Sequence, residues 1–163
     1  MNPLAGNNNS SRQEFRTLQV LFWALTGGTF FCALVIFAIR YFNLLEQKSF
    51  SDNTSRLFAL AIAVIALVCW MTAVSQYKKG IILAKNLTGS LDEKLDVYRS
   101  VLIRYLALCE FPALLAVINY MITGEWWTLV ITALLIVAMF MKRPTVPRLT
   151  DELSLGWNDA AQL

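Results

Sequence analysis

A single carboxylate, Glu110, stands deep inside a long apolar stretch, LALCEFPALLAVINYMIT, at residues 106–123. The charged form of a carboxyl group is disfavoured in apolar surroundings, so Glu110 is expected to be mostly protonated. A neutral acid can both donate and accept hydrogen bonds. Pro112 cannot donate to the carbonyl of Leu108, which leaves an acceptor free and favours a bend beside the acid. These are the ingredients of a proton or cation site.

Polar partners for this acid are expected from other apolar runs. Thr26 and Thr29 lie in the first run, and Thr132 lies in the last. Each falls near the middle of its run, so all three should reach the depth of Glu110. The candidate midmembrane polar site is therefore Glu110, Thr26, Thr29 and Thr132.

A second interpretation is that Glu110 only fixes helix packing, as a protonated hydrogen-bonding group. Arg104 is a poor partner for it, because six residues of helix separate the two by about 120° around the axis and about 9 Å along it. Arg104 is expected to reach lipid headgroups instead. Lys142 and Arg143, at the end of the last apolar run, have the same expected role as headgroup anchors.

The composition places these residues in a membrane protein. The chain has 163 residues, of which 57% are hydrophobic and 15% charged, against about 45–50% and about 25% in soluble domains. The apolar runs predict an all-α membrane protein with four transmembrane helices in an antiparallel bundle. The expected spans are residues 17–39, 57–77, 101–122 and 126–141, within a transmembrane domain at 12–143.

Small residues mark the expected helix contacts. Gly27 and Gly28 lie in the middle of the first span, where they let another helix approach closely. In the second span a stripe of mostly small residues recurs at helical spacing, and we call it the alanine stripe: Ala59, Ala63, Ala66, Trp70 and Ala73. Within it, Ala63 and Ala66 bracket the expected depth of Glu110.

Between spans two and three the helices should continue beyond the membrane. Residues 78–89 extend the second helix, and Ser90 with Glu93 matches a capping box that opens the third. That helix should run to about Ile122, so its first ten residues form a cytoplasmic helical extension. A tight turn at residues 123–125 then leads into the fourth span.

Lysine and arginine placement predicts the orientation. Eleven of these residues fall on one side of the expected spans and three on the other, so both termini are expected in the cytoplasm. The eleven are Arg12, Arg16, Lys78, Lys79, Lys85, Lys94, Arg99, Arg104, Lys142, Arg143 and Arg148; the three are Arg40, Lys48 and Arg56. Residues 1–11 are predicted to be a disordered tail, and residues 144–163 a cytoplasmic tail with a short surface helix.

The residue types argue against several functions. The chain has no histidine, and its three cysteines lie in apolar runs without metal-ligand spacing. No phosphate-binding loop, dinucleotide fingerprint or catalytic triad is present, so we expect no enzyme, no cofactor and no metal. The basic residues are expected to meet phospholipid rather than nucleic acid. The expected partners are the lipid bilayer and other membrane helices, or further copies of the chain.

Three stretches of the second half suggest relatives: VYRSVLIRYLALCE at residues 97–110, NYMITG at 119–124 and MKRPT at 141–145. In them the sequence resembles a family of small four-span proteins of the bacterial inner membrane, best over residues 90–155. The resemblance implies topology and location, and draws attention to Arg104 and Glu110, but implies no activity. The similarity to rotary-ATPase proteolipids is weaker, because their acid lies in an even-numbered, glycine-rich span.

Two functions follow as hypotheses. The favoured one is a non-enzymatic accessory or structural component of the membrane that works with partner helices. The alternative is a small transporter or channel-like protein that uses Glu110 to handle protons or cations.

Overall fold

The computed structural model describes residues 7–42, 52–87 and 91–154. Five α-helices make up this part of the chain: α1 (Asn7–Tyr41), α2 (Asp52–Asn86), α3 (Leu91–Thr123), α4 (Trp126–Phe140) and α5 (Val146–Leu153). None of the described residues is in a β-strand. The all-α prediction is therefore confirmed for them.

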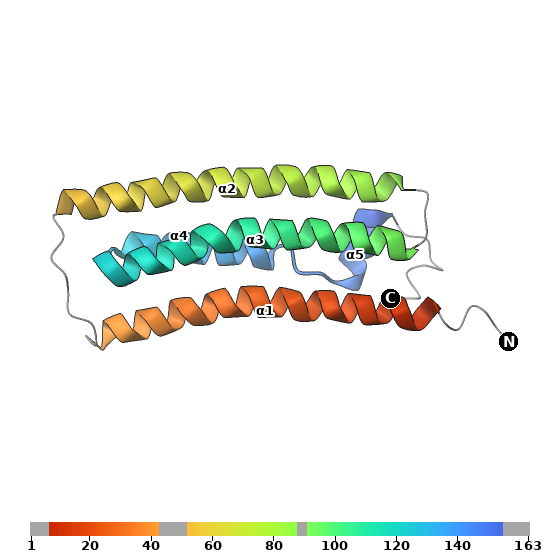
Figure 1. Cartoon of the computed structure of the whole chain (residues 1–163), viewed down its shortest axis with the longest axis horizontal. Coiled ribbons are helices and arrows are strands. Elements are labelled where there is room, and N and C mark those ends of the chain that lie inside the picture. Colours follow the sequence, from red (N-terminus) through yellow and green to blue (C-terminus); the bar gives the residue numbers. More distant parts are fainter. Residues whose placement is uncertain (1–6, 43–51, 88–90, 155–163) are drawn as a thin grey trace.

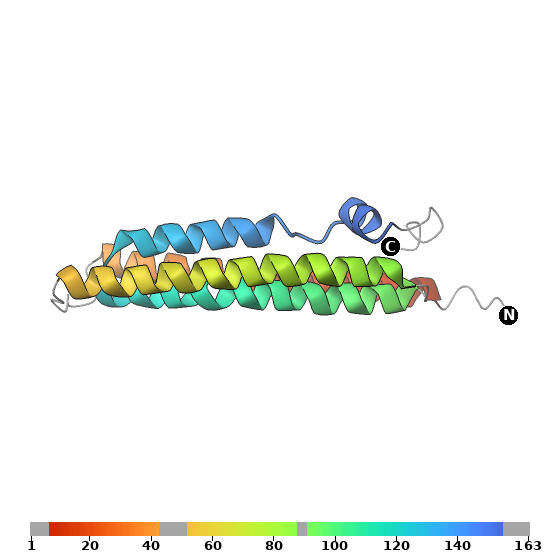
Figure 2. The same ribbon diagram turned by 90° about the horizontal axis from the view of Figure 1, so that it is seen from above.

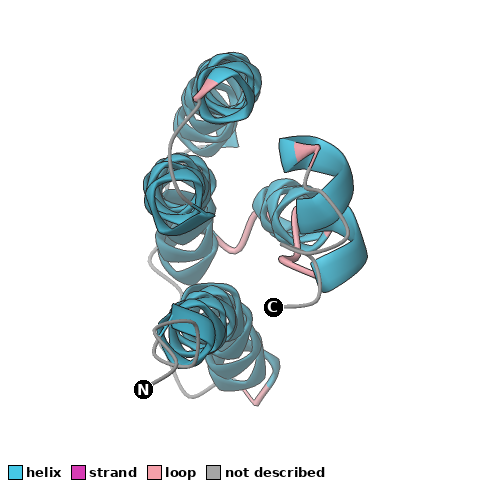
Figure 3. Cartoon of the chain, turned by 90° about the vertical axis from the view of Figure 1, so that its right-hand side faces the viewer, coloured by secondary structure: helices cyan, strands magenta, loops and turns pink. Residues whose placement is uncertain are grey.

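The three long helices form a layer with α3 in the middle. α1 and α2 lie on either side of α3, as Figures 1 and 3 show. α4 lies on one face of this layer, and α5 follows it on the same face (Figure 2). The colours in Figure 1 show that consecutive helices from α1 to α4 run in alternate directions. α3 packs against α1, α2 and α4, so it is the centre of the fold.

Burial separates α3 from its neighbours. Half of its most apolar stretch is buried inside the molecule, compared with 17% for α1 and 11% for α2. Large apolar side chains such as Phe31, Leu60 and Leu134 are exposed, and exposed apolar surface on this scale is typical of membrane contact. α1, α2 and α3 are each long and apolar enough to cross a membrane, while α4 is a shorter apolar helix of 15 residues. The fold thus fits an integral membrane protein.

The prediction of a disordered tail at residues 1–11 is wrong for residues 7–11, because α1 already begins at Asn7. Residues 1–6 lie outside the described part. Asn and Ser cost only a fraction of a kcal/mol each within a helix, so a helix stabilised further along can include them. Polar composition alone does not show where a helix begins.

The boundaries of the third helix are close to those expected. α3 begins at Leu91 and runs unbroken through Pro112 to Thr123. Ser90, the expected cap, lies outside the described residues. Gly124 then adopts a φ of +76°, which favours glycine, and its N–H donates to the carbonyl oxygen of Tyr120 at 2.9 Å.

The largest core cluster lies at the end of the molecule that holds α5. It joins residues of the first part of α1, the last part of α2 and the first part of α3 to Leu149 and Leu153 of α5. These two leucines are buried and four residues apart, so one face of α5 is apolar. The short helix expected in the C-terminal tail is thus present as α5, and it packs on the bundle.

Candidate functional site

Glu110 and Thr29 meet between α3 and α1. The Thr29 hydroxyl donates to Glu110 Oε1 at 3.4 Å and to the carbonyl oxygen of Leu25, one turn earlier, at 2.9 Å. Thr29 is buried, while Glu110 is half-buried at the edge of the contact. The Glu110 carboxyl group therefore accepts a long hydrogen bond, for which it shares the Thr29 proton with Leu25, while part of it stays exposed at the surface of the layer.

The other two threonines of the expected site lie elsewhere. Thr26 is fully buried one turn before Thr29, and its hydroxyl has no hydrogen-bond partner in the described part of the chain. Thr132 donates to the carbonyl oxygens of Ala113, at 3.3 Å, and Thr128, at 3.1 Å. Its hydroxyl therefore links α4 to α3 by a hydrogen bond to Ala113 and does not bond to Glu110. Of the four expected site residues, the structure thus joins only Glu110 and Thr29 by a hydrogen bond.

The glycine pair of α1 makes no close helix contact with the part of the chain that the structure describes. A β-carbon added to Gly27 or Gly28 would meet no atom within 4 Å. The close helix approach expected at this pair is thus absent among the described residues. Only a separate helix could use these glycines for packing.

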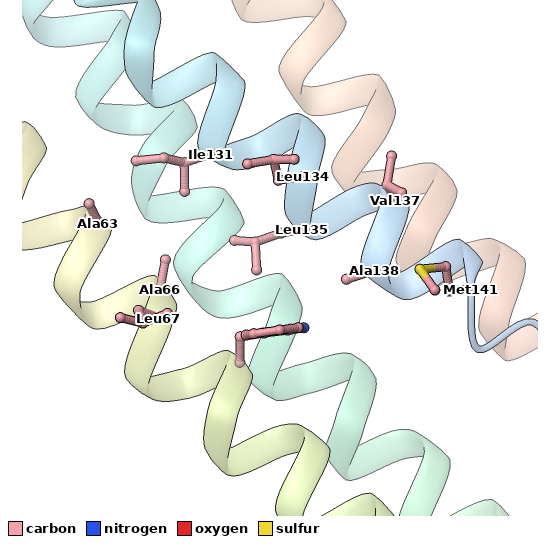
Figure 4. Close-up of a pocket in the computed structure, with 10 residues that line it drawn as sticks. Ala63, Ala66, Leu67, Ile131, Leu134, Leu135, Val137, Ala138 and Met141 are labelled. Carbon is pink, nitrogen blue, oxygen red and sulfur yellow. The ribbon is translucent and has the colours of Figure 1, made fainter.

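Only part of the alanine stripe packs against other helices of the described chain. Ala66 is buried against Ala113 of α3 and Leu135 of α4, whereas Ala63 is exposed. Both line an apolar groove of about 440 Å³ between α2 and α4, together with Leu134 and Met141 of α4 (Figure 4). We call it the α2–α4 groove. Three of its ten lining residues are alanines and the other seven are larger apolar residues, so the groove has room and apolar surface for another apolar segment.

A further groove of about 370 Å³ adjoins it, because Ala63 and Ile131 line both. Its other end is marked by Arg56, Glu125 and Trp127. Together the two grooves follow α4 for most of its length.

Cations and aromatic rings gather at one level of the molecule, which we call the first belt: Trp23, Tyr77, Arg104, Tyr105, Lys142 and Arg143. Lys142 Nζ lies 4.2 Å from the centre of the Tyr77 ring, and the Arg143 guanidinium lies 5.2 Å from that of Trp23. The rings of Tyr77 and Tyr105 are 5.4 Å apart. These contacts link interior positions of α1, α2 and α3 and the start of the α4–α5 connection at one height.

A second belt lies near the C-terminal end of α3. It consists of Arg40, Tyr41, Tyr120, Trp126 and Trp127. The Arg40 guanidinium lies 5.9 Å from the centre of the Tyr120 ring, and it donates to the carbonyl oxygen of Met121 at 3.4 Å. Trp126 and Trp127 stack at 3.9 Å. Along α3, Arg104 of the first belt and Tyr120 of the second are separated by about 24 Å.

A polar network holds α5 at the first belt. The Tyr77 hydroxyl donates to Glu152 Oε2 at 2.6 Å, and Arg148 Nε donates to Glu152 Oε1 at 2.9 Å. Arg148 also donates to the carbonyl oxygen of Met141. Burial by itself lowers the pKa of Arg148, but the hydrogen bond and charge of Glu152 outweigh it and raise that pKa. Burial, and then the charge of Arg148, lower the pKa of Lys142.

Sequence reasoning missed this network and one close helix contact. The four-residue spacings of Arg148 with Glu152, and of Leu149 with Leu153, are the signals that could have shown α5 docking. Gly80 is the close contact: a β-carbon there would lie 3.1 Å from Cβ of Val101 and nearer still to its methyl groups. A lone glycine inside a helix often has such a packing reason.

Among the residues that the structure describes, no group of three or more His, Cys, Asp or Glu could hold a metal ion. Comparison of the chain with protein-family models, curated proteins and solved structures gives no match. The resemblance to four-span proteins of the bacterial inner membrane therefore stays a prediction.

Proposed function

We propose that the chain crosses the bacterial inner membrane four times, with both termini in the cytoplasm. The two belts support this placement, because their separation of about 24 Å along α3 approaches the 30 Å of a bilayer core, and long side chains at both interfaces can cover the difference. Tryptophan, tyrosine, lysine and arginine are the residues that anchor membrane proteins at both interfaces. α4, although short, joins one belt to the other.

The first belt then marks the cytoplasmic surface. Most of the lysine and arginine residues lie at it or beyond it, as the positive-inside rule requires. The early turns of α1 and α3, the last turns of α2, and α5 form a cytoplasmic extension around the largest core cluster.

Within this placement, the protein is a non-enzymatic accessory component that binds another transmembrane helix. The observation that carries the proposal is the α2–α4 groove, whose three alanines and larger apolar side chains would lie at bilayer depth with none of the described helices over them. Small residues allow close helix packing in lipid, where apolar surface alone does not drive association. The open glycine pair of α1 offers a second such face.

Photo-crosslinking in native membranes tests this function. A photoreactive amino acid at Leu134, which is exposed on the groove, should give a discrete adduct with a protein that carries a membrane helix. Ala63→Trp should lower the adduct yield at least about tenfold, because the indole would fill the groove.

Val64→Trp is the matched control, since Val64 is exposed beside Ala63 but does not line the groove. It should leave the adduct unchanged. Absence of any adduct, together with a strictly monomeric protein in mild detergent, would contradict the proposal. A second copy and a different protein are both acceptable partners, and the mass of the adduct tells them apart.

A second candidate function rests on the hydrogen bond between Thr29 and Glu110. We infer that Glu110 could take up and release a proton or cation from the half-exposed edge of the α1–α3 contact. The buried, unpaired hydroxyl of Thr26 would provide a further oxygen nearby. An acid at bilayer depth is rare enough to make this function worth testing.

Flux into proteoliposomes tests the second candidate. If Glu110 carries transport, Glu110→Gln should abolish a wild-type proton or cation flux, because the amide cannot titrate. Glu125→Gln, at the second belt, should leave the flux unchanged. Absence of flux in the wild type, or equal flux in Glu110→Gln, would refute transport by Glu110.

A further inference from the structure

A polar groove of about 650 Å³ lies between α2 and α3, and we call it the α2–α3 groove. Gln76 and Lys79 line it from α2, and Ser100 and Arg104 line it from α3. Gly80 lies in the groove wall, where its contact with Val101 brings the two helices close together. Two cations and two neutral hydrogen-bonding groups thus converge on one space.

No described acidic residue balances the charge of this groove. Lys79 and Arg104 are both exposed, and neither forms an ion pair among the described residues. Among the described residues, no Asp or Glu lines the groove. It is therefore suited to an anion, with the guanidinium of Arg104 able to bind two oxygens of one phosphate.

The position of the groove indicates which anion. Arg104 belongs to the first belt, and Lys79 lies two residues beyond Tyr77 of the same belt. In the membrane placement proposed above, this is the height of the phosphates of the cytoplasmic leaflet. A membrane phosphate would reach this groove without leaving the bilayer surface.

The apolar surface on the membrane side of the groove suits acyl chains. Phe111 lies seven residues after Arg104, and Val68 lies eleven residues before Lys79, so each shares a helix face with its cation. Both side chains are exposed. A lipid with its phosphate in the groove would therefore find apolar side chains along both helices below it.

We propose that the α2–α3 groove is a binding site for the phosphate of an anionic phospholipid. The site rests on the proposed membrane placement, but not on the partner helix or on Glu110. Lys79 and Arg104 bind the phosphate oxygens, while Gln76 and Ser100 donate hydrogen bonds to the phosphate or headgroup. The lipid would tie the end of the second span to the start of the third.

Native mass spectrometry of the full-length chain in mild detergent tests the site, with phosphatidylglycerol and phosphatidylcholine as probes. The wild type should retain phosphatidylglycerol preferentially. Lys79→Gln with Arg104→Gln should weaken its binding about 25-fold, at about fivefold for each cation removed. Binding of phosphatidylcholine should not change. Equal retention of the two lipids by the wild type would overturn the proposal.

The matched control is Lys85→Gln with Arg99→Gln, which removes the same charge from the same two helices outside the groove. Its binding of phosphatidylglycerol should stay within about twofold of the wild type. An equal loss in both double variants would mean diffuse attraction and overturn the site. Inorganic phosphate at matched ionic strength should not displace the lipid; displacement would assign the groove to free phosphate. Because the chain is tested alone, these results do not depend on the partner helix.

Discussion

Gly80→Leu is expected to lower the free energy of unfolding by about 3 kcal/mol. A side chain at this position would overlap Val101 from its Cβ outward, so α2 and α3 must separate. Overpacking of a closed contact costs about 1–3 kcal/mol, and a leucine adds several atoms beyond Cβ. Denaturant titration of the purified protein in mild detergent, followed by circular dichroism, measures the loss.

Gly28→Leu is the matched control, because a β-carbon at Gly28 meets nothing within 4 Å. It should be neutral or slightly stabilising, since leucine favours the helix more than glycine does. The smaller pair Gly80→Ala and Val101→Ala completes the test. The double variant should be more stable than the sum of the two single effects predicts, by about 1–2 kcal/mol. Additive effects of the two substitutions on the free energy of unfolding would show that Gly80 and Val101 are not energetically coupled.

Leu149→Ala is expected to release α5 from the bundle. Leu149 is fully buried, and removal of a buried leucine costs about 2–5 kcal/mol. A helix of eight residues has little stability of its own. The substitution therefore destabilises the state in which α5 is packed on the bundle. A loss of about 2 kcal/mol raises the fraction of undocked α5 about 25-fold, because 1.4 kcal/mol corresponds to a factor of ten. Trypsin cleavage after Arg148 should therefore become at least about 25-fold faster.

Asp151→Ala serves as the control, because Asp151 is exposed on the same helix. Its cleavage rate should stay close to that of the wild type. Glu152→Leu should accelerate cleavage as well, since it removes the acceptor shared by Tyr77 and Arg148. Equal protection of the wild type and Leu149→Ala would mean that α5 is held by something other than its apolar face.

The sequence predicted the long helices well because their signals are local. An apolar run, a glycine after its end and a change to charged residues are all visible within a few turns. α3 and α4 accordingly begin and end within two residues of the expected positions, and the turn between them contains the expected glycine. The start of α1 was less predictable, because its polar first turns carry no apolar period.

The candidate site was predictable only in part. The depth of Glu110 and Thr29 follows from their positions in the apolar runs, and the structure joins them at 3.4 Å. Thr132 has the same depth but lies on another side of α3, where it bonds to Ala113. The position of a residue along its apolar run can be read from that run alone. Which neighbouring helix its side chain faces depends on how the two helices are rotated relative to each other.

The sequence by itself thus determined the helical class, the apolar lengths and the single acid within them, because these depend on residue type and local spacing. Only the tertiary structure decided that α1, α3 and α2 form a layer, with α4 on one face and open grooves beside it. It also decided that Gly27 and Gly28 face open space while Gly80 carries the tight contact. The physical reason is that helix contacts are set by the shapes of two surfaces together, and one sequence pattern describes only one of them at a time.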